Sequence, residues 1–136
     1  MAYKKEHMPE RKYVRSRDDL FLVEAEAVCI GSDVLVYIWG GNRPHIGSVA
    51  VAQPRPSLED PSRVSATASV ITFPGHKEDS LVKEAAEQIA AVLDTHVVVT
   101  AGIHWDDLNT EGITMIMANC REVIRDLLLE LKQRGF

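Results

Sequence analysis

One short run constrains the fold more than any other part of this chain. Residues 34–39 read VLVYIW and contain no charged side chain. Successive side chains of a β-strand point to opposite faces of a sheet, so this run is apolar on both faces. That pattern is typical of an interior strand. The chain is therefore predicted to form a sheet in which residues 33–39 are an interior strand.

Four other segments have strand patterns. Residues 19–30 alternate between apolar and polar side chains over most of their length, which predicts a half-buried strand. Gly31 follows directly and suits the tight turn of a hairpin to the interior strand. Residues 48–53, residues 64–73 (which are rich in β-branched side chains) and residues 96–103 complete the predicted strands.

Two segments have the period of amphipathic helices. The first begins with a cap at Asp79 or Ser80 and runs to about residue 93, and the second is capped near residue 109 or 110 and ends at Gly135. The buried stripe expected for the first helix is Val82, Ala85, Ala86, Ile89, Ala90 and Leu93. The stripe of the second helix is Ile113, Ile116, Met117, Cys120, Ile124, Leu127, Leu128 and Leu131.

The order of these elements is ββββαβα, which predicts an α+β domain. We expect a mixed, mostly antiparallel five-stranded sheet with both helices packed on one face. If the first four strands form an antiparallel meander and the first helix is a crossover, then strands 33–39, 64–73 and 96–103 point the same way. The loops that follow these three strands should then emerge at one edge of the sheet.

Composition narrows the class of protein. The chain has 136 residues, a formal net charge of −5 and 46% hydrophobic residues, as expected of one globular domain. Residues 1–17 hold six Lys or Arg against two Glu, so we expect a basic, flexible N-terminal arm followed by a single domain over residues 18–136. The acidic body argues against nucleic-acid binding. Without an apolar run long enough for a membrane span or export signal, and with two distant cysteines, a cytoplasmic protein is expected.

The three loops expected at one edge carry the candidate site. The first is rich in glycine and contains Arg43 and His45, the second contains His76 and Lys77, and the third contains His104. Backbone N–H groups of a glycine-rich loop, together with Arg and Lys side chains, suit an anionic group such as phosphate. Convergence of the three loops would therefore favour a site for a phosphate-bearing ligand.

The histidines also permit two enzymatic interpretations. His45, His76 and His104, with Asp106 or Asp107, have the donor types of a zinc or iron site, although no pair has the short spacing of a metal motif. A histidine next to a carboxylate, as in His104 and Asp106, also suits proton transfer. A metal-dependent enzyme acting on a small anionic substrate therefore remains an alternative to a binding protein, as does an oligomeric structural subunit.

Three short motifs resemble a known family. GGNRPHIG at residues 40–47, FPGHK at residues 73–77 and AGIHWD at residues 101–106 are similar to the prenylated-flavin chaperone-like domain found as the small subunit of gallate-decarboxylase systems. The resemblance spans roughly residues 20–133. It implies a non-catalytic accessory protein that holds or delivers prenylated flavin mononucleotide (FMN) for a UbiD-like decarboxylase, the large subunit of such systems.

Site roles follow from this hypothesis rather than from a known family mechanism. We expect glycines 40 and 41 and Arg43 to contact the phosphate, Trp105 to lie against the ring, and the three loop histidines to line the cofactor or a bridging ion. A homo-oligomer is expected, because a subunit interface would complete a site that so small a chain forms only in part. The expected cofactor-binding residues are Gly40, Gly41, Arg43, His45, His76, Lys77, His104 and Trp105.

Overall fold

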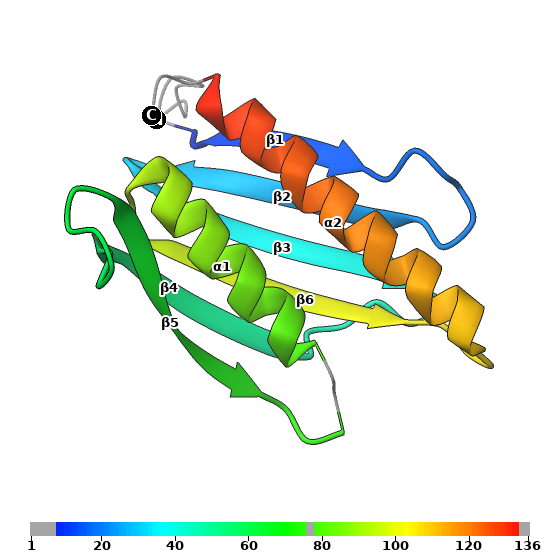
Figure 1. The fold of residues 1–136 in the computed structure, drawn as a ribbon. Coiled ribbons are helices and arrows are strands. Elements are labelled where there is room, and N and C mark those ends of the chain that lie inside the picture. The colour runs from blue at the N-terminus through cyan, green and yellow to red at the C-terminus, as the bar shows by residue number, and fades with distance from the viewer. Residues whose placement is uncertain (1–7, 76–77, 134–136) are drawn as a thin grey trace.

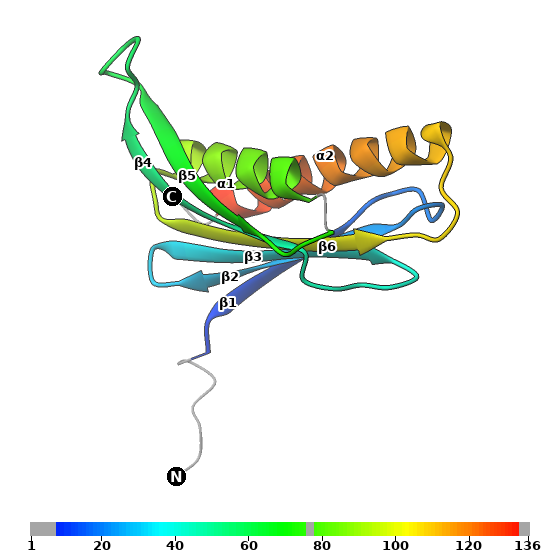
Figure 2. The same cartoon turned by 90° about the horizontal axis from the view of Figure 1, so that it is seen from below.

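The computed structural model of the protein describes residues 8–75 and 78–133. It has two layers, a six-stranded sheet and two helices that lie across one face of that sheet (Figure 1, Figure 2). In the part of the chain that the structure describes, the other face carries no helix. The elements in chain order are β1 (Glu10–Arg15), β2 (Val23–Ile30), β3 (Asp33–Gly41), β4 (Ser48–Pro56), β5 (Val64–Thr72), α1 (Asp79–Leu93), β6 (Val97–His104) and α2 (Thr110–Lys132).

The sheet confirms the predicted fold class but has one more strand than predicted. Its order is β1-β2-β3-β6-β4-β5, with β3 and β6 parallel and all other neighbours antiparallel. The sixth strand is Glu10–Arg15, which we assigned to the flexible arm and which pairs with β2 along its whole length. Charged side chains are tolerated on an exposed edge strand, so the basic composition of this segment concealed its strand character.

The position of β6 interrupts the predicted four-strand meander. This strand lies between β3 and β4, so β3 and β4 are not neighbours. The predicted directions are nevertheless confirmed, because β6 is parallel to β3 and antiparallel to β4, which is antiparallel to β5. The loops after β3, β5 and β6 therefore emerge at one edge. A hydrogen bond of 2.9 Å from the Phe73 N–H to the Gly47 carbonyl joins two of them.

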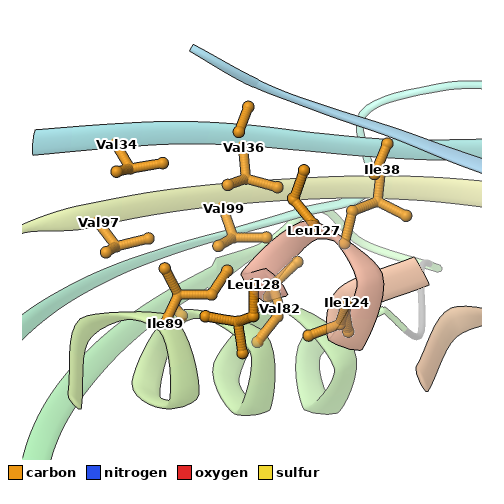
Figure 3. Close-up of a cluster of buried hydrophobic side chains, with 14 of the residues drawn as sticks. Val34, Val36, Ile38, Val82, Ile89, Val97, Val99, Ile124, Leu127 and Leu128 are labelled. Atoms are coloured by element: carbon orange, nitrogen blue, oxygen red, sulfur yellow. The ribbon is translucent and has the colours of Figure 1, made fainter. Parts of the chain in front are cut away.

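The core lies between the sheet and the helices (Figure 3). Helix α1 packs on β4, β5 and β6, and α2 packs on β1 and β2. All six residues of the predicted α1 stripe are buried. The predicted α2 stripe is buried except at Ile113, which is 52% exposed, and Met117, which is half-buried. Both exceptions lie in the half of α2 nearest its N-terminus, next to the cavity described below.

The two helices begin in different ways. The Asn109 side chain caps α2 as predicted and accepts a hydrogen bond of 2.8 Å from the Gly112 N–H. At α1 the N-cap is Glu78 rather than the predicted Asp79 or Ser80, and no side chain makes a cap hydrogen bond. The Glu78 carboxylate instead accepts a hydrogen bond from the Ile103 N–H of β6. Among the described residues, neither helix is long and apolar enough to cross a membrane.

Candidate functional site

The glycine-rich loop after β3 crosses over the end of β6. The N–H groups of Arg43, His45 and Gly47 donate to backbone carbonyls of β6 at 3.3, 3.5 and 2.9 Å. Gly102 permits this crossing, because a Cβ atom at that position would lie 1.6 Å from the His45 carbonyl oxygen. The loop that carries the predicted site residues Arg43 and His45 is therefore held against β6 by backbone contacts.

A histidine and a carboxylate meet under this loop. The His45 Nε2 lies 3.1 Å from Glu78 Oε1, and the same oxygen accepts a hydrogen bond of 3.2 Å from the Ile103 N–H. The side chain of Glu78 is only 11% exposed, and its Oε2 is buried without a hydrogen-bond partner among the residues that the structure describes. Gly47 makes room for the carboxylate, because a Cβ atom there would lie 2.4 Å from Oε2. Glu78 thus joins the β3–β4 loop, β6 and the start of α1.

Glu78 also lines an apolar cavity of about 280 Å³ between the end of β6 and the first turns of the two helices. Most of the wall is hydrophobic, and it includes Leu81, Ile103, Trp105, Leu108, Ile113 and Met117. The Trp105 ring contacts the Phe21 ring edge-on, with centroids 5.5 Å apart and planes at 87°. The predicted ring-contacting residue, Trp105, therefore lies in the wall of a cavity.

Cys120 forms part of the same wall, and burial raises the pKa of its thiol from 9.0 to about 12. We expect iodoacetamide at pH 8 to leave Cys120 unmodified in the native protein and to alkylate it after unfolding in guanidinium, because only the thiolate reacts. Mass spectrometry before and after unfolding measures this, and rapid labelling of native Cys120 would contradict it.

The raised pKa of Cys120 also predicts that the stability of the protein falls as the pH rises from about 9 towards 12, since the thiol loses its proton first in the unfolded chain.

The predicted residues at the rim form a second, exposed cluster. The His104 Nε2 lies 3.0 Å from Asp106 Oδ1, and the Arg43 Nε lies 3.8 Å from the same oxygen. The Asn42 side chain accepts a hydrogen bond of 3.1 Å from the Asp106 N–H. His104 and Arg43 side chains are 47% and 74% exposed. They lie at the predicted edge, but they face solvent rather than a closed pocket.

Glycines 40 and 41 both have close protein neighbours. A Cβ atom at Gly40 would lie 2.8 Å from the Leu22 carbonyl oxygen and 3.1 Å from the Trp105 ring, and one at Gly41 would lie 1.9 Å from the His104 carbonyl oxygen. Gly41 also has a φ of +93°, a conformation that favours glycine. Packing therefore explains why both positions are glycine, and their contact with a phosphate stays a prediction.

The three-histidine metal site is not supported. His45 contacts Glu78 and His104 contacts Asp106, while His76 and Lys77 lie outside the described residues. Within residues 8–75 and 78–133, no group of three His, Cys, Asp or Glu side chains is placed to hold a metal ion. The wide separation of the histidines in the sequence provided no spacing constraint, so donor type alone suggested the metal.

An apolar cavity with a single carboxylate in its wall is typical of a protein that binds a small molecule. Comparison with protein families defines that class further. The model of the prenylated flavin chaperone LpdD-like domain matches residues 18–132, so the chain belongs to this family. The resemblance recognised in the three motifs is confirmed by this match.

Two other comparisons add little to the family assignment. No curated protein matches the chain. A solved structure described as a novel chaperone complex for yeast 20S proteasome assembly is 12% identical, with a TM-score of 0.46, and the match covers 90% of this chain and 96% of that one. At this level of similarity the neighbour carries no functional argument.

Proposed function

We propose that this protein binds prenylated FMN in the cavity beside Trp105 and delivers it to a UbiD-like decarboxylase during maturation of that enzyme. The observation that carries the proposal is the apolar cavity itself, found in a chain that belongs to a family of prenylated flavin chaperones. Prenylation adds hydrocarbon to the flavin ring, and an apolar wall removes that hydrocarbon from water.

Size decides which part of the cofactor enters. A volume of about 280 Å³ is slightly below the usual range of roughly 300–1,000 Å³ for ligand pockets. In our proposal the prenylated ring occupies the cavity against Trp105, while the ribityl phosphate stays at the mouth. Glu78 is the polar group of the wall, and its carboxylate favours a ring edge that carries an N–H donor.

Three features support a phosphate at the mouth. The backbone N–H groups at the start of α1 have no side-chain cap and attract an anion, against the opposing effect of the Glu78 and Asp79 carboxylates at the same helix end. Ser80 lines the cavity from the first turn of that helix and offers a hydroxyl donor. Lys77 immediately precedes Glu78 in the sequence, and Arg43 is an exposed cation of the rim. We propose these groups, together with His45, His76 and His104, as the polar surroundings of the nucleotide tail.

Two matched substitutions on α2 test the cavity. Ile113 lines the cavity and is 52% exposed, whereas Leu129 is 55% exposed and does not line it. Ile113→Asp should weaken prenylated FMN binding at least tenfold, because it places a carboxylate in the apolar wall near a dianionic ligand. Leu129→Asp adds the same charge elsewhere and should leave affinity unchanged. Anaerobic titration followed by flavin fluorescence measures both.

The same pair of variants tests delivery. Protein loaded with prenylated FMN is mixed with a cofactor-free UbiD-like decarboxylase, and the rise of decarboxylase activity is compared with that produced by free cofactor. We expect faster activation by the parent chain and by Leu129→Asp than by Ile113→Asp. Failure of the parent chain to bind prenylated FMN, or equal affinity of the two variants, would contradict the proposed cavity.

A further inference from the structure

The sheet face opposite the helices, here called the outer face, is covered among the described residues only at one end, where the β3–β4 loop crosses β6 (Figure 2). We propose that a second copy of this chain covers it, so that two sheets pack face to face in a homodimer. Three properties of the outer face support the dimer, namely its apolar side chains, the pairing of its charges and its area. None of them involves the cavity, which lies on the helix side of the sheet.

The outer face is apolar where a solvated sheet face is normally polar. The pairing register places Leu35, Val98 and Val51 side by side across β3, β6 and β4. Val49 and Ile71 are paired in the next outward-facing row. Val51 is 54% exposed and Ile71 is 70% exposed. The central strands therefore carry apolar side chains on both faces of the sheet, although the helices cover only one face.

Aromatic rings extend this surface towards β1. Trp39 stacks on Tyr37 with centroids 5.6 Å apart, and Tyr13 lies 6.3 Å from Trp39. Tyrosine and tryptophan are enriched at protein interfaces, because their large rings bury apolar area with little loss of conformational entropy. The rings and the aliphatic rows form one continuous patch across the register of the sheet.

The charges beside the patch favour a copy of the same chain over a strongly charged partner. Glu26 lies 3.5 Å from Arg11 and accepts a hydrogen bond from the Tyr37 hydroxyl, while Glu24 accepts one from the Tyr13 hydroxyl. These charged groups are therefore satisfied within the face. Pairing of these charges within the face lowers the electrostatic cost of bringing two copies together, although each chain carries a net charge of −5.

The area of the outer face is sufficient for a stable dimer. Six strands about 4.8 Å apart and about seven residues long, at roughly 3.3 Å per residue, give a footprint of about 670 Å². Two such faces bury at most about 1,300 Å², because the β3–β4 loop covers one end of each, and this upper bound is within the range of roughly 1,200–2,000 Å² for specific interfaces. Sheets that pack in this way lie about 10 Å apart and bury their facing side chains as in a sandwich core.

Sedimentation equilibrium of the full chain tests the dimer. We expect about twice the chain mass of 15.1 kDa for the parent protein. Val51→Lys should convert it to a monomer, because a buried lysine in an apolar interface is unpaired. Leu129→Lys, at a similarly exposed position on the helix side, should remain a dimer. Circular dichroism verifies folding, and Ile71→Lys replaces Val51→Lys if the latter does not fold.

Three results would overturn the proposal. The first is a parent chain that is monomeric at tens of micromolar. A monomer whose outer face binds only a decarboxylase counts as this result. The second is a dimer that survives both outer-face substitutions. The third is a dimer that Leu129→Lys disrupts while Val51→Lys does not. Because Val51 is remote from the cavity lining, a monomeric Val51→Lys variant that still binds prenylated FMN separates this proposal from the proposed function.

Discussion

Gly102→Ala is expected to lower the free energy of unfolding by about 3 kcal/mol, near the upper end for overpacking. The added methyl group would overlap the backbone of the loop that crosses β6, because its Cβ would lie 1.6 Å from the His45 carbonyl oxygen and 2.2 Å from the carbonyl carbon. Backbone atoms cannot rotate away as a side chain can, so the loop must leave β6. Chemical denaturation measures the loss, and a fall of roughly 10 °C in melting temperature should accompany it.

Displacement of the loop should also reach the proposed binding site. His45 would move away from Glu78, and Glu78 lines the cavity. We therefore expect Gly102→Ala to bind prenylated FMN more weakly even under conditions where it is fully folded. Gly31→Ala is the matched control, because its φ of +61° disfavours alanine but no atom lies within 4 Å of the added Cβ. Equal stability of the two variants would refute the steric explanation.

Leu127→Ala should cost about 2–5 kcal/mol, the usual range for truncating a fully buried leucine. Leu127 has no exposed surface and points from α2 into the core, near Val99 and Ile38 (Figure 3). Its removal leaves a cavity between the helix and the sheet that neighbouring side chains fill only in part. Urea denaturation of the variant measures the loss, provided that the transition remains two-state.

The control for this substitution lies on the same helix. Leu129 is 55% exposed, so Leu129→Ala should change stability by less than about 0.5 kcal/mol. The two variants delete the same atoms and have the same helix propensity, which leaves burial as the only difference. Comparable losses for both would mean that α2 does not pack on the sheet through the face that carries Leu127.

Sequence periodicity predicted the elements well, because each depends on local pattern. The apolar stripe of α1, the cap at Asn109 and the common direction of β3, β5 and β6 all follow from spacing and connectivity. The position of β6 between β3 and β4 does not. Parallel and antiparallel neighbours satisfy the same apolar pattern, so pairing is decided by packing across the whole sheet.

The candidate site was predicted only in part for a similar reason. Connectivity predicted that His45 and His104 lie at one edge of the sheet. The third motif predicted Trp105 as a site residue, and the structure places Trp105 in the cavity wall. Glu78 was overlooked as a site residue, because an acidic residue at the start of a helix is ordinary in sequence. Its burial arises from Gly47 and Ile103, which are distant in the chain. The helical period placed Ile113 in the buried stripe of α2, so it could not reveal that this side chain is exposed and lines the cavity.

The strand order has a consequence for synthesis of the protein. Among the described strands, the β2–β3 and β4–β5 hairpins share no hydrogen-bonded neighbours until β6 joins them, and β6 is the last of these strands to leave the ribosome. At about 5–20 residues per second, the roughly 30 residues from the end of β5 to the end of β6 take about two to six seconds to translate. During that interval the inner edges of both hairpins are unpaired and open to association with other nascent chains.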